Sequence, residues 1–417
     1  MTVQTLTPPV ETKTKPAKTT LLSVVIPAYN EEEGIAAIIE RVLAVQTHLD
    51  TMGINLELLV VDDGSQDRTA EVVATYDEVR LLRHNPNRGY GAALKTGFCA
   101  AEGDLLAFLD ADGTYPPASL PVLCQEILDG ADVAVGSRRS GAASEMPTVR
   151  RIGNFIWSNL VSVLANHRVN DPASGMRVFR RSTLNQLYPL PDGLNFTPVM
   201  STRAAHENLT VVEVPMPYKE RQGRSKLSVV KDGMRFLSTI IWTALYYNPA
   251  RIFGSIGVTL FAISSLIALA LAALRITGTT TLEPAGVFST FLAVVLGIAG
   301  FTLFALGATF NYLVALFHNN PVRQGLFGEP IFDPPLDRQF WWMGLLSITG
   351  GSGLGAVSLI LGLNGWEIER LWLYLLAGTM LALMGLQLTI FWVIMRVLDE
   401  LSRRDLMIKA DLEQTYV

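Results

Sequence analysis

Residues 21–31 read LLSVVIPAYNE, a short apolar run rich in β-branched residues that ends in proline, tyrosine, asparagine and glutamate. Such a run, bounded by turn-forming residues, predicts a buried strand over Leu21–Pro27 and a helix over Glu31–Leu49. The pattern returns at Leu56–Asp62 (LELLVVD), which predicts a second strand, and Asp67–Tyr76 is expected to be helical after it. The first half of the chain is therefore expected to consist of strand–helix units.

Further elements continue this alternation towards residue 214. Strands are predicted at Val79–Arg83, Asp104–Asp110, Asp132–Ser137 and Leu209–Val214, with helices near Gly89–Ala101 and Pro117–Leu128. Strands that alternate with helices predict βαβ units and a mostly parallel sheet, which is an α/β fold. Ligands of such sheets bind beyond the carboxyl ends of the strands. Polar clusters follow three predicted strand ends, and we expect the functional site there: Pro27–Glu31, Asp62–Asp67 and Asp110–Gly113.

Composition divides the chain into a charged part and an apolar part. The 417 residues are too many for one compact core, and the charged fraction of 17% is concentrated in roughly the first 250 residues. After Arg251 the sequence becomes overwhelmingly apolar, which indicates a soluble domain followed by a membrane domain. The net charge of −5 without a long basic tract argues against a nucleic acid partner.

Four stretches without charged side chains are long enough to cross a membrane, since a span needs about 20 helical residues. They are Ile252–Leu274, Pro284–Phe317, Trp341–Trp366 and Leu371–Met395. No ionisable residue lies deep inside these stretches, which argues against a proton-coupled pump. The sequence thus predicts an α-helical membrane domain of four spans.

Lysine and arginine at the span ends predict the orientation of the chain. They gather before the first span, between the second and third, and after the fourth, at Lys226, Lys231, Arg235, Arg251, Arg323, Arg338, Arg396, Arg403, Arg404 and Lys409. The two remaining loops carry only Arg275 and Arg370. Both termini and the first domain are therefore expected in the cytoplasm, in an integral protein of a bacterial or archaeal plasma membrane or of the endoplasmic reticulum.

These patterns predict five consecutive parts of the chain. Residues 1–20 have no apolar core of a signal peptide and are expected to be a disordered cytoplasmic tail. A catalytic domain over 21–227 is followed by an amphipathic interfacial helix over 228–250, although a plain core helix there stays open. The membrane domain then covers 251–396, and a cytoplasmic tail covers 397–417.

Two carboxylates at one predicted strand end provide the first chemical signal. Residues i and i+2 of an extended strand share a face, so Asp110 and Asp112 can both address one hard cation. Such a cation can bridge the two phosphates of a nucleotide diphosphate and neutralise the charge of that leaving group. Taken singly, the segment Asp62–Asp67 is explained equally well as a structural helix cap, and the segment Asp110–Gly113 is explained equally well as a structural turn. Three polar clusters in this order at strand ends favour a nucleotide site.

The segments PAYNEEE (27–33), DDGSQD (62–67) and DADG (110–113) resemble the nucleotide-binding segments and the metal motif of family-2 GT-A glycosyltransferases. Within that family, the chain resembles dolichol-phosphate mannose synthases and bacterial polyprenyl-phosphate glycosyltransferases. This finer match rests on GSR (136–138), DPASGMR (171–177) and RQGRSK (221–226), and the likeness covers about Leu21–Val230. The QxxRW motif of processive polysaccharide synthases is absent, which argues against polymerisation.

The resemblance implies a Rossmann-like GT-A catalytic domain that uses a UDP- or GDP-linked sugar and Mg²⁺ or Mn²⁺. It implies that the base and ribose contact Pro27, Tyr29, Glu31 and Asp63. Asp110 and Asp112 would bind the metal and act in catalysis, and Asp110 would also contact the nucleotide. Asp171 would orient the acceptor, although capping a turn before Pro172 is a second role for it.

Basic residues are expected to hold phosphate groups, because arginine offers a bidentate fork to them. Those expected to bind the donor or acceptor phosphate, together with a neighbouring serine, are Arg138, Arg177, Arg221, Arg224, Ser225 and Lys226. Alternatively, the stretch from Arg221 to Lys226 is a flank that binds anionic lipids, and both roles are compatible.

The expected reaction is inverting transfer of a hexose from the nucleotide sugar to a polyprenyl phosphate. The phosphate is ionised near neutral pH, so positioning and charge neutralisation are expected to dominate over general base catalysis. Two alternatives stay open: transfer to another lipid or to a protein, and a glycolipid translocator with a regulatory nucleotide-sugar-binding domain. Membrane lipids are expected partners, and a homo-oligomer is compatible with the sequence.

Overall fold

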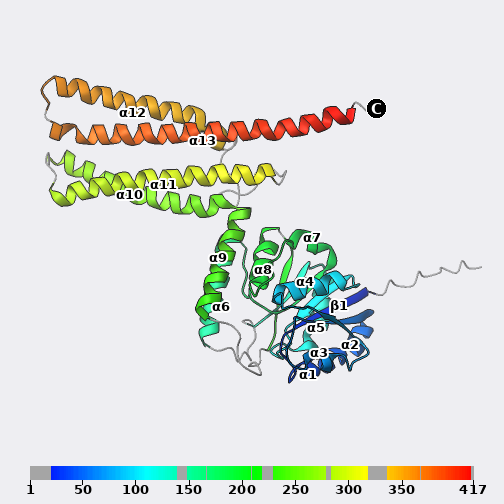
Figure 1. Cartoon of the computed structure of the whole chain (residues 1–417). Helices are drawn as coiled ribbons and strands as arrows, with labels where there is room; N and C mark the ends of the chain where they lie inside the picture. The colour runs from blue at the N-terminus through cyan, green and yellow to red at the C-terminus, as the bar shows by residue number, and fades with distance from the viewer. Residues whose placement is uncertain are drawn as a thin grey trace, which may run out of the picture. The chain divides into compact units, whose positions relative to one another are not determined.

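The computed structural model describes residues 20–138, 148–165, 167–207, 209–217, 229–278, 283–317, 336–366 and 368–414 (Figure 1). The chain divides into two compact units, and the division falls between Ile240 and Ile241. This point lies inside helix α9 (Val229–Tyr247), the helix predicted as interfacial. The predicted tail over 1–20 lies almost wholly outside the described residues.

The first unit is built on one sheet of seven strands among the described residues. Their order across the sheet is β3 (Val79–Arg83), β2 (Ile54–Asp62), β1 (Thr20–Ala28), β4 (Leu105–Leu109), β6 (Met176–Arg180), β5 (Val133–Ser137) and β7 (Val211–Pro215). All neighbouring pairs are parallel except those that β6 makes with β4 and β5. The predicted mostly parallel α/β sheet is confirmed.

The strand order brings several chain segments to one edge of this sheet. β1 is parallel to both β2 and β4, with Ala28 level with Asp62, so the carboxyl ends of these three strands point the same way. β6 runs in the opposite direction, with Met176 paired to Leu109, so β6 begins where β4 ends. The edge lies at the point where the strand order reverses, which is the usual ligand position in open α/β sheets.

Helices cover both faces of the sheet. One apolar cluster packs α1 (Ile35–Leu43), α2 (Gln46–Thr51), α3 (Thr69–Val73) and α5 (Leu120–Leu128) on one face. The other face carries α4 (Tyr90–Ala100), α7 (Leu184–Leu187) and α8 (Phe196–His206). Burying one phenylalanine contributes about 1.5–3 kcal/mol, and Phe98, Phe108 and Phe196 meet within this second cluster.

Helix α6 (Thr148–Ala165) packs beside the sheet through a small third cluster that includes Val161, Ala205 and Ile240. Neither α6 nor α8 was predicted, and β6 was missed as well. The helix predicted over Glu31–Leu49 is two helices, since α1 ends at Leu43 and α2 begins at Gln46. Single turns of 3₁₀ helix occur at Pro117–Ser119, Arg181–Thr183 and Leu336–Gln339.

The second unit contains four helices long and apolar enough to cross a membrane, counted over the described part of the chain. They are α10 (Pro249–Ile276), α11 (Pro284–Phe317), α12 (Phe340–Leu363) and α13 (Ile368–Gln414). The four predicted spans fall on these helices, and α13 continues as a helix beyond its apolar part. This arrangement confirms a GT-A-type α/β domain followed by four candidate transmembrane helices.

Small residues allow the apolar helices to approach closely in pairs. A Cβ added to Gly257 of α10 would lie 2.6 Å from the carbonyl oxygen of Gly300 in α11. A Cβ added to Gly351 of α12 would lie 2.5 Å from the carbonyl oxygen of Gly378 in α13. Glycine at these positions lets backbones meet, which is the usual way apolar helices associate in lipid.

Candidate active site

Two loops at the sheet edge are joined by hydrogen bonds. The amide of Asn30, after β1, donates to the Ser65 hydroxyl at 2.9 Å, and the Asn30 side-chain oxygen accepts from the Gln66 amide at 2.8 Å. The amide of Glu31 donates to Thr69 Oγ1 at 2.9 Å. Asn30 has a φ of +51°, a left-handed conformation that asparagine tolerates better than most residues. The predicted nucleotide segments PAYNEEE and DDGSQD therefore form one continuous surface.

The predicted nucleoside residues lie at the rim of this surface. Pro27 is buried at the end of β1, whereas the side chains of Tyr29 and Glu31 are partly exposed. Pro27 is among the last residues of β1, and Tyr29 and Glu31 come directly after this strand, so the structure brings all three to the same edge of the sheet. Their contact with base and ribose stays a prediction.

Asp63 is buried, and its carboxylate accepts hydrogen bonds from the backbone just before α4. The donors are the amides of Arg88 at 2.9 Å and Gly89 at 2.8 Å. His84 Nδ1 lies 2.7 Å from Asp63 Oδ1, and the other ring nitrogen lies 2.9 Å from Thr96 Oγ1. Asp63 thus fixes the loop that leads into α4, and a contact between Asp63 and the nucleotide stays a prediction.

Asp110 and Asp112 follow β4 directly and are both partly exposed. The Tyr90 hydroxyl donates to Asp110 Oδ1 at 2.8 Å. Asp112 Oδ1 accepts from the hydroxyl of Thr114 at 2.6 Å and from its amide at 3.2 Å. Both carboxylates therefore stand at the carboxyl end of a central strand with protein donors that set their orientation.

The residues present fit a hard divalent cation that is shared with a ligand. Within the described ranges, no three acidic, histidine or cysteine side chains gather in a way that can hold a metal ion. Asp110 and Asp112 supply hard oxygen donors, and Mg²⁺ typically binds through one or two carboxylates together with waters and substrate phosphates. The donor set thus suits a cation completed by a diphosphate, rather than a closed structural metal site.

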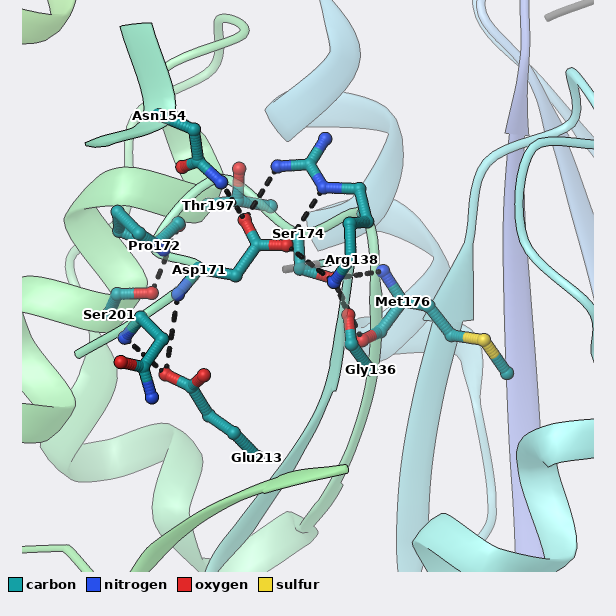
Figure 2. Close-up of polar contacts among 12 residues, drawn as sticks. Gly136, Arg138, Asn154, Asp171, Pro172, Ser174, Met176, Thr197, Ser201 and Glu213 are labelled. Atoms are coloured by element: carbon teal, nitrogen blue, oxygen red, sulfur yellow. Dashed lines mark hydrogen bonds and ion pairs between the residues drawn. The ribbon is translucent and has the colours of Figure 1, made fainter. Parts of the chain in front are cut away.

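Asp171 forms a buried ion pair with Arg138, the residue after β5 (Figure 2). Arg138 Nε donates to Asp171 Oδ2 at 2.8 Å, Arg138 Nη2 donates to Oδ1 at 2.6 Å, and the Arg138 amide donates to Oδ2 at 2.9 Å. Asn154 Nδ2 of α6 donates to Oδ1 at 3.0 Å. Asp171 therefore ties β5, α6 and the loop before β6 together.

Opposing effects set the ionisation of Asp171. Burial raises the pKa of this carboxyl, but the charge and hydrogen bonds of Arg138 and the amide of Asn154 outweigh burial and hold the pKa below its usual value. A carboxylate with a lowered pKa is a poor proton acceptor at neutral pH. Orientation of the acceptor by Asp171 stays a prediction.

Arg177 lies fully buried beneath the same loop. Its Nη2 donates to the carbonyl of Pro172 at 2.9 Å and to the Ser201 hydroxyl at 2.8 Å. Its Nε donates to the carbonyl of Ser174 at 3.3 Å. Burial lowers the pKa of Arg177 to about 10, so the guanidinium is still charged at neutral pH. These partners hold the loop in shape, and a contact between Arg177 and a phosphate stays a prediction.

Several residues of the site were not predicted from sequence. Glu213 on β7 accepts from the amides of Asn170 at 2.6 Å and Asp171 at 3.3 Å, beneath the loop shown in Figure 2. Asn154 and Tyr90 act on Asp171 and Asp110 as described. The sequence does contain a feature that could have drawn attention to Tyr90. In NRGYG (87–91) this tyrosine stands between two glycines, and glycines at a helix start permit close approach of the backbone to other groups. The predicted residues Arg221, Arg224, Ser225 and Lys226 lie outside the described residues.

Comparison with known proteins identifies the family. The model of glycosyl transferase family 2 matches residues 23–188, and the model of a domain of unknown function matches residues 249–409. A low-salt glycan biosynthesis hexosyltransferase of Haloferax volcanii is 32% identical over 82% of this chain and 77% of its own length. The chain belongs to glycosyl transferase family 2, and it is a glycosyltransferase.

Other relatives carry names that include a lipid phosphate. A dolichyl-phosphate hexose transferase of Haloferax volcanii is 31% identical over 54% of this chain and 94% of its own length. An undecaprenyl-phosphate 4-deoxy-4-formamido-L-arabinose transferase of Photorhabdus laumondii is 30% identical over 74% of this chain and 94% of its own length. The predicted resemblance to family-2 polyprenyl-phosphate glycosyltransferases is confirmed, and the four apolar helices mark an integral membrane protein.

Proposed function

We propose that this glycosyltransferase moves a hexose from a UDP- or GDP-linked donor to a polyprenyl phosphate, with inversion, at the cytoplasmic face of a membrane. The observation that carries the proposal is the position of Asp110 and Asp112 at the carboxyl end of β4, in a chain that also has four apolar helices. The names of the relatives, which include dolichyl phosphate and undecaprenyl phosphate, support a lipid phosphate acceptor.

The donor lies along the sheet edge in this proposal. Pro27, Tyr29, Glu31 and Asp63 contact the base and ribose, and the diphosphate extends towards Asp110 and Asp112. These two carboxylates would hold Mg²⁺ or Mn²⁺, which would neutralise charge on the departing diphosphate. The loops after β1 and β2 support this placement, because the hydrogen bonds between them join the two predicted nucleotide segments into one surface.

The reaction is a single displacement at the anomeric carbon of the sugar. A phosphate oxygen of the lipid forms the new bond to this carbon as the bond to the nucleoside diphosphate breaks, so the configuration inverts. The attacking phosphate is ionised, so the chain needs to position it rather than remove a proton. We therefore assign Asp171 to holding Arg138 in place, a role that its hydrogen bonds and lowered pKa support.

The acceptor stays in the bilayer and presents only its phosphate. Removing a polyprenyl chain from lipid would cost on the order of 0.8 kcal/mol for each CH₂-sized unit. An exposed apolar face on α6 supports an approach of this domain to the membrane, since Ile152, Phe155 and Ile156 are each more than half exposed. Arg221, Arg224, Ser225 and Lys226 would bind the lipid phosphate or the donor phosphate.

The orientation of the chain follows from the distribution of lysine and arginine. We propose that the catalytic domain over 21–227, the interfacial helix over 228–250 and both termini lie on the cytoplasmic side, with four spans over 251–396. This orientation gives the catalytic domain access to nucleotide sugars, which are made in the cytoplasm.

A panel of donors tests the proposed function. Full-length protein in detergent is supplied with polyprenyl phosphate, Mg²⁺ or Mn²⁺ and one of several UDP- and GDP-linked hexoses, and the products are identified by mass. We expect one donor to yield a polyprenyl-phosphate hexose and free nucleoside diphosphate. Absence of a lipid product with every donor, from a folded protein, would reject the proposal.

A further inference from the structure

The Tyr90 hydroxyl contacts a proposed metal ligand, and the proposed function gives it no role. Tyr90 is the first residue of α4, and its hydroxyl donates to Asp110 Oδ1 at 2.8 Å. Tyr90 lies 20 residues before Asp110, on a helix that covers one face of the sheet. The bond therefore crosses from a helix start to the carboxyl end of β4, where the metal site is proposed.

The position of Tyr90 is fixed by its neighbours. The amide of Gly91 donates to the carbonyl of Asp192 at 2.7 Å, and a Cβ added to Gly89 would lie 2.6 Å from that same oxygen. The Tyr90 ring packs edge-to-face on Phe196 with ring centroids 6.5 Å apart. Because backbone and ring are both held, the hydroxyl is directed at Asp110.

The other side of Asp110 is equally confined. A Cβ added to Gly175 would lie 2.6 Å from Asp110 Cγ and would overlap Oδ2, so a side chain at this position would displace the carboxylate. The amide of Gly175 donates to the Tyr115 hydroxyl at 2.6 Å, which fixes the backbone at that point. Asp110 is thus held between a hydroxyl on one oxygen and a glycine backbone at the other.

We infer that Tyr90 is a positioning residue that orients Asp110 for the divalent cation held with the donor diphosphate. Hydrogen bonds from neighbouring groups commonly orient carboxylates that bind metals, and losing one typically lowers metal affinity about 10–100-fold. The inference rests on the proposed function, because it presupposes a metal at Asp110 and Asp112. It adds a residue on α4 to a metal site that the sequence motif DADG placed on one strand only.

The test measures metal binding rather than activity. Full-length wild-type protein and Tyr90→Phe are titrated with Mn²⁺ in the presence of UDP or GDP, whichever the wild type binds, and free Mn²⁺ is followed by electron paramagnetic resonance. We expect the Mn²⁺ Kd of Tyr90→Phe to rise about 10–100-fold, with an unchanged Tm. Tyr76→Phe is the matched control, because it also removes a hydroxyl from a carboxylate, Glu40, at 3.2 Å.

A double-mutant cycle shows whether Tyr90 acts through Asp110. In an Asp110→Asn background, the further change Tyr90→Phe should alter the Mn²⁺ Kd less than about twofold if the two residues act as one unit.

In the single-variant titration, a Mn²⁺ Kd of Tyr90→Phe within threefold of wild type would overturn the inference and leave the proposed function intact. Weaker Mn²⁺ binding by Tyr90→Phe together with a clearly lower Tm would also overturn the inference, since Tyr90 would then act through packing. If wild type shows no Mn²⁺-dependent nucleotide binding, the proposed function fails and the inference with it.

Discussion

At the scale of single residues, Asp112 has the plainest assignment in the proposed site. Its carboxylate is partly exposed and is oriented by Thr114, and it lies beyond a strand whose five residues are all buried. A carboxylate in this position contributes little to packing, so its removal should affect chemistry more than stability. Because an effect on chemistry can be told apart from an effect on stability at this position, Asp112 is a suitable residue to substitute.

We expect Asp112→Asn to lower kcat by at least about a hundredfold, because a bound divalent cation contributes several kcal/mol to charge stabilisation. Membrane insertion and the Tm should stay as in wild type. The measurement is the turnover of donor and polyprenyl phosphate in saturating Mn²⁺ and, separately, Mg²⁺. Asp129→Asn is a suitable control, since Asp129 follows α5, is exposed, and its carboxylate accepts a hydrogen bond from the Gln125 side chain at 2.9 Å. Activity of Asp112→Asn near that of wild type would show that Asp112 does not hold the metal.

The sequence indicated the carboxylates of the candidate site, but it did not indicate the side chains that donate hydrogen bonds to them. Strand ends and polar clusters pointed to Asp63 and Asp110, because carboxylates after buried strands are visible in a one-dimensional pattern. Asp171 was named only through the motif DPASGMR, which resembles the family. The hydroxyl of Tyr90 and the amide of Asn154 reach these carboxylates from helices, 20 and 17 residues away in sequence. Such contacts depend on how helices pack on the sheet, which local pattern does not contain.

At the scale of elements, the pair Arg138–Asp171 connects β5, α6 and the loop before β6. Removing one partner of a buried ion pair leaves the other charge uncompensated and typically costs about 3–5 kcal/mol. The pair is therefore expected to stabilise the arrangement of these elements as well as to orient Arg138.

We expect Asp171→Asn to lower the Tm of the protein in detergent by on the order of 10 °C at neutral pH. Because the folded pKa of Asp171 is lowered, its stabilisation is present above the unfolded value of about 3.9 and is lost as pH falls through the folded value. The Tm difference from wild type should thus be constant at neutral pH and narrow below about pH 4. Asp50→Asn, at an exposed helix position, is the control. A difference that widens in acid, or no difference at pH 7, would contradict this assignment.

Elements with a simple apolar pattern were predicted well, and irregular ones were not. β1, β2 and α11 consist mainly of apolar residues, and the predicted range Pro284–Phe317 matches α11. β6 (MRVFR) was missed, although β3 (VRLLR) also has two arginines among five residues and was predicted. The two strands differ in that the arginines of β3 are exposed, whereas Arg177 of β6 is buried among the carbonyls and the hydroxyl that accept its hydrogen bonds. A buried charged residue is recognisable only once its partners are known.

At the scale of the whole molecule, the chain combines an α/β glycosyltransferase unit with four apolar helices. The sequence predicted this division from composition, since charge is rare after Arg251. The proposed acceptor explains the combination, because a lipid phosphate remains at the membrane surface while its nucleotide-linked donor is soluble.

The basic residues ahead of the membrane domain test this explanation. We expect the double change Arg224→Glu and Lys226→Glu to raise the apparent KM for polyprenyl phosphate more than about tenfold, because it replaces attraction for a phosphate by repulsion. The KM for the donor should change much less. Initial rates at varied lipid and fixed donor, and then the reverse, provide both constants. A rise in the donor KM alone would assign these residues to the nucleotide diphosphate instead.

The most direct test of the central claim is a competition between acceptors. Full-length protein in nanodiscs receives its preferred nucleotide sugar and Mn²⁺ together with equal amounts of polyprenyl phosphate and diacylglycerol, and the lipids are analysed by mass and by the anomeric configuration of the sugar. We predict hexose on the polyprenyl phosphate alone, with inverted configuration, and no product after chelation of the metal. Hexose on diacylglycerol, retained configuration, or undiminished transfer in a chelator would contradict the account.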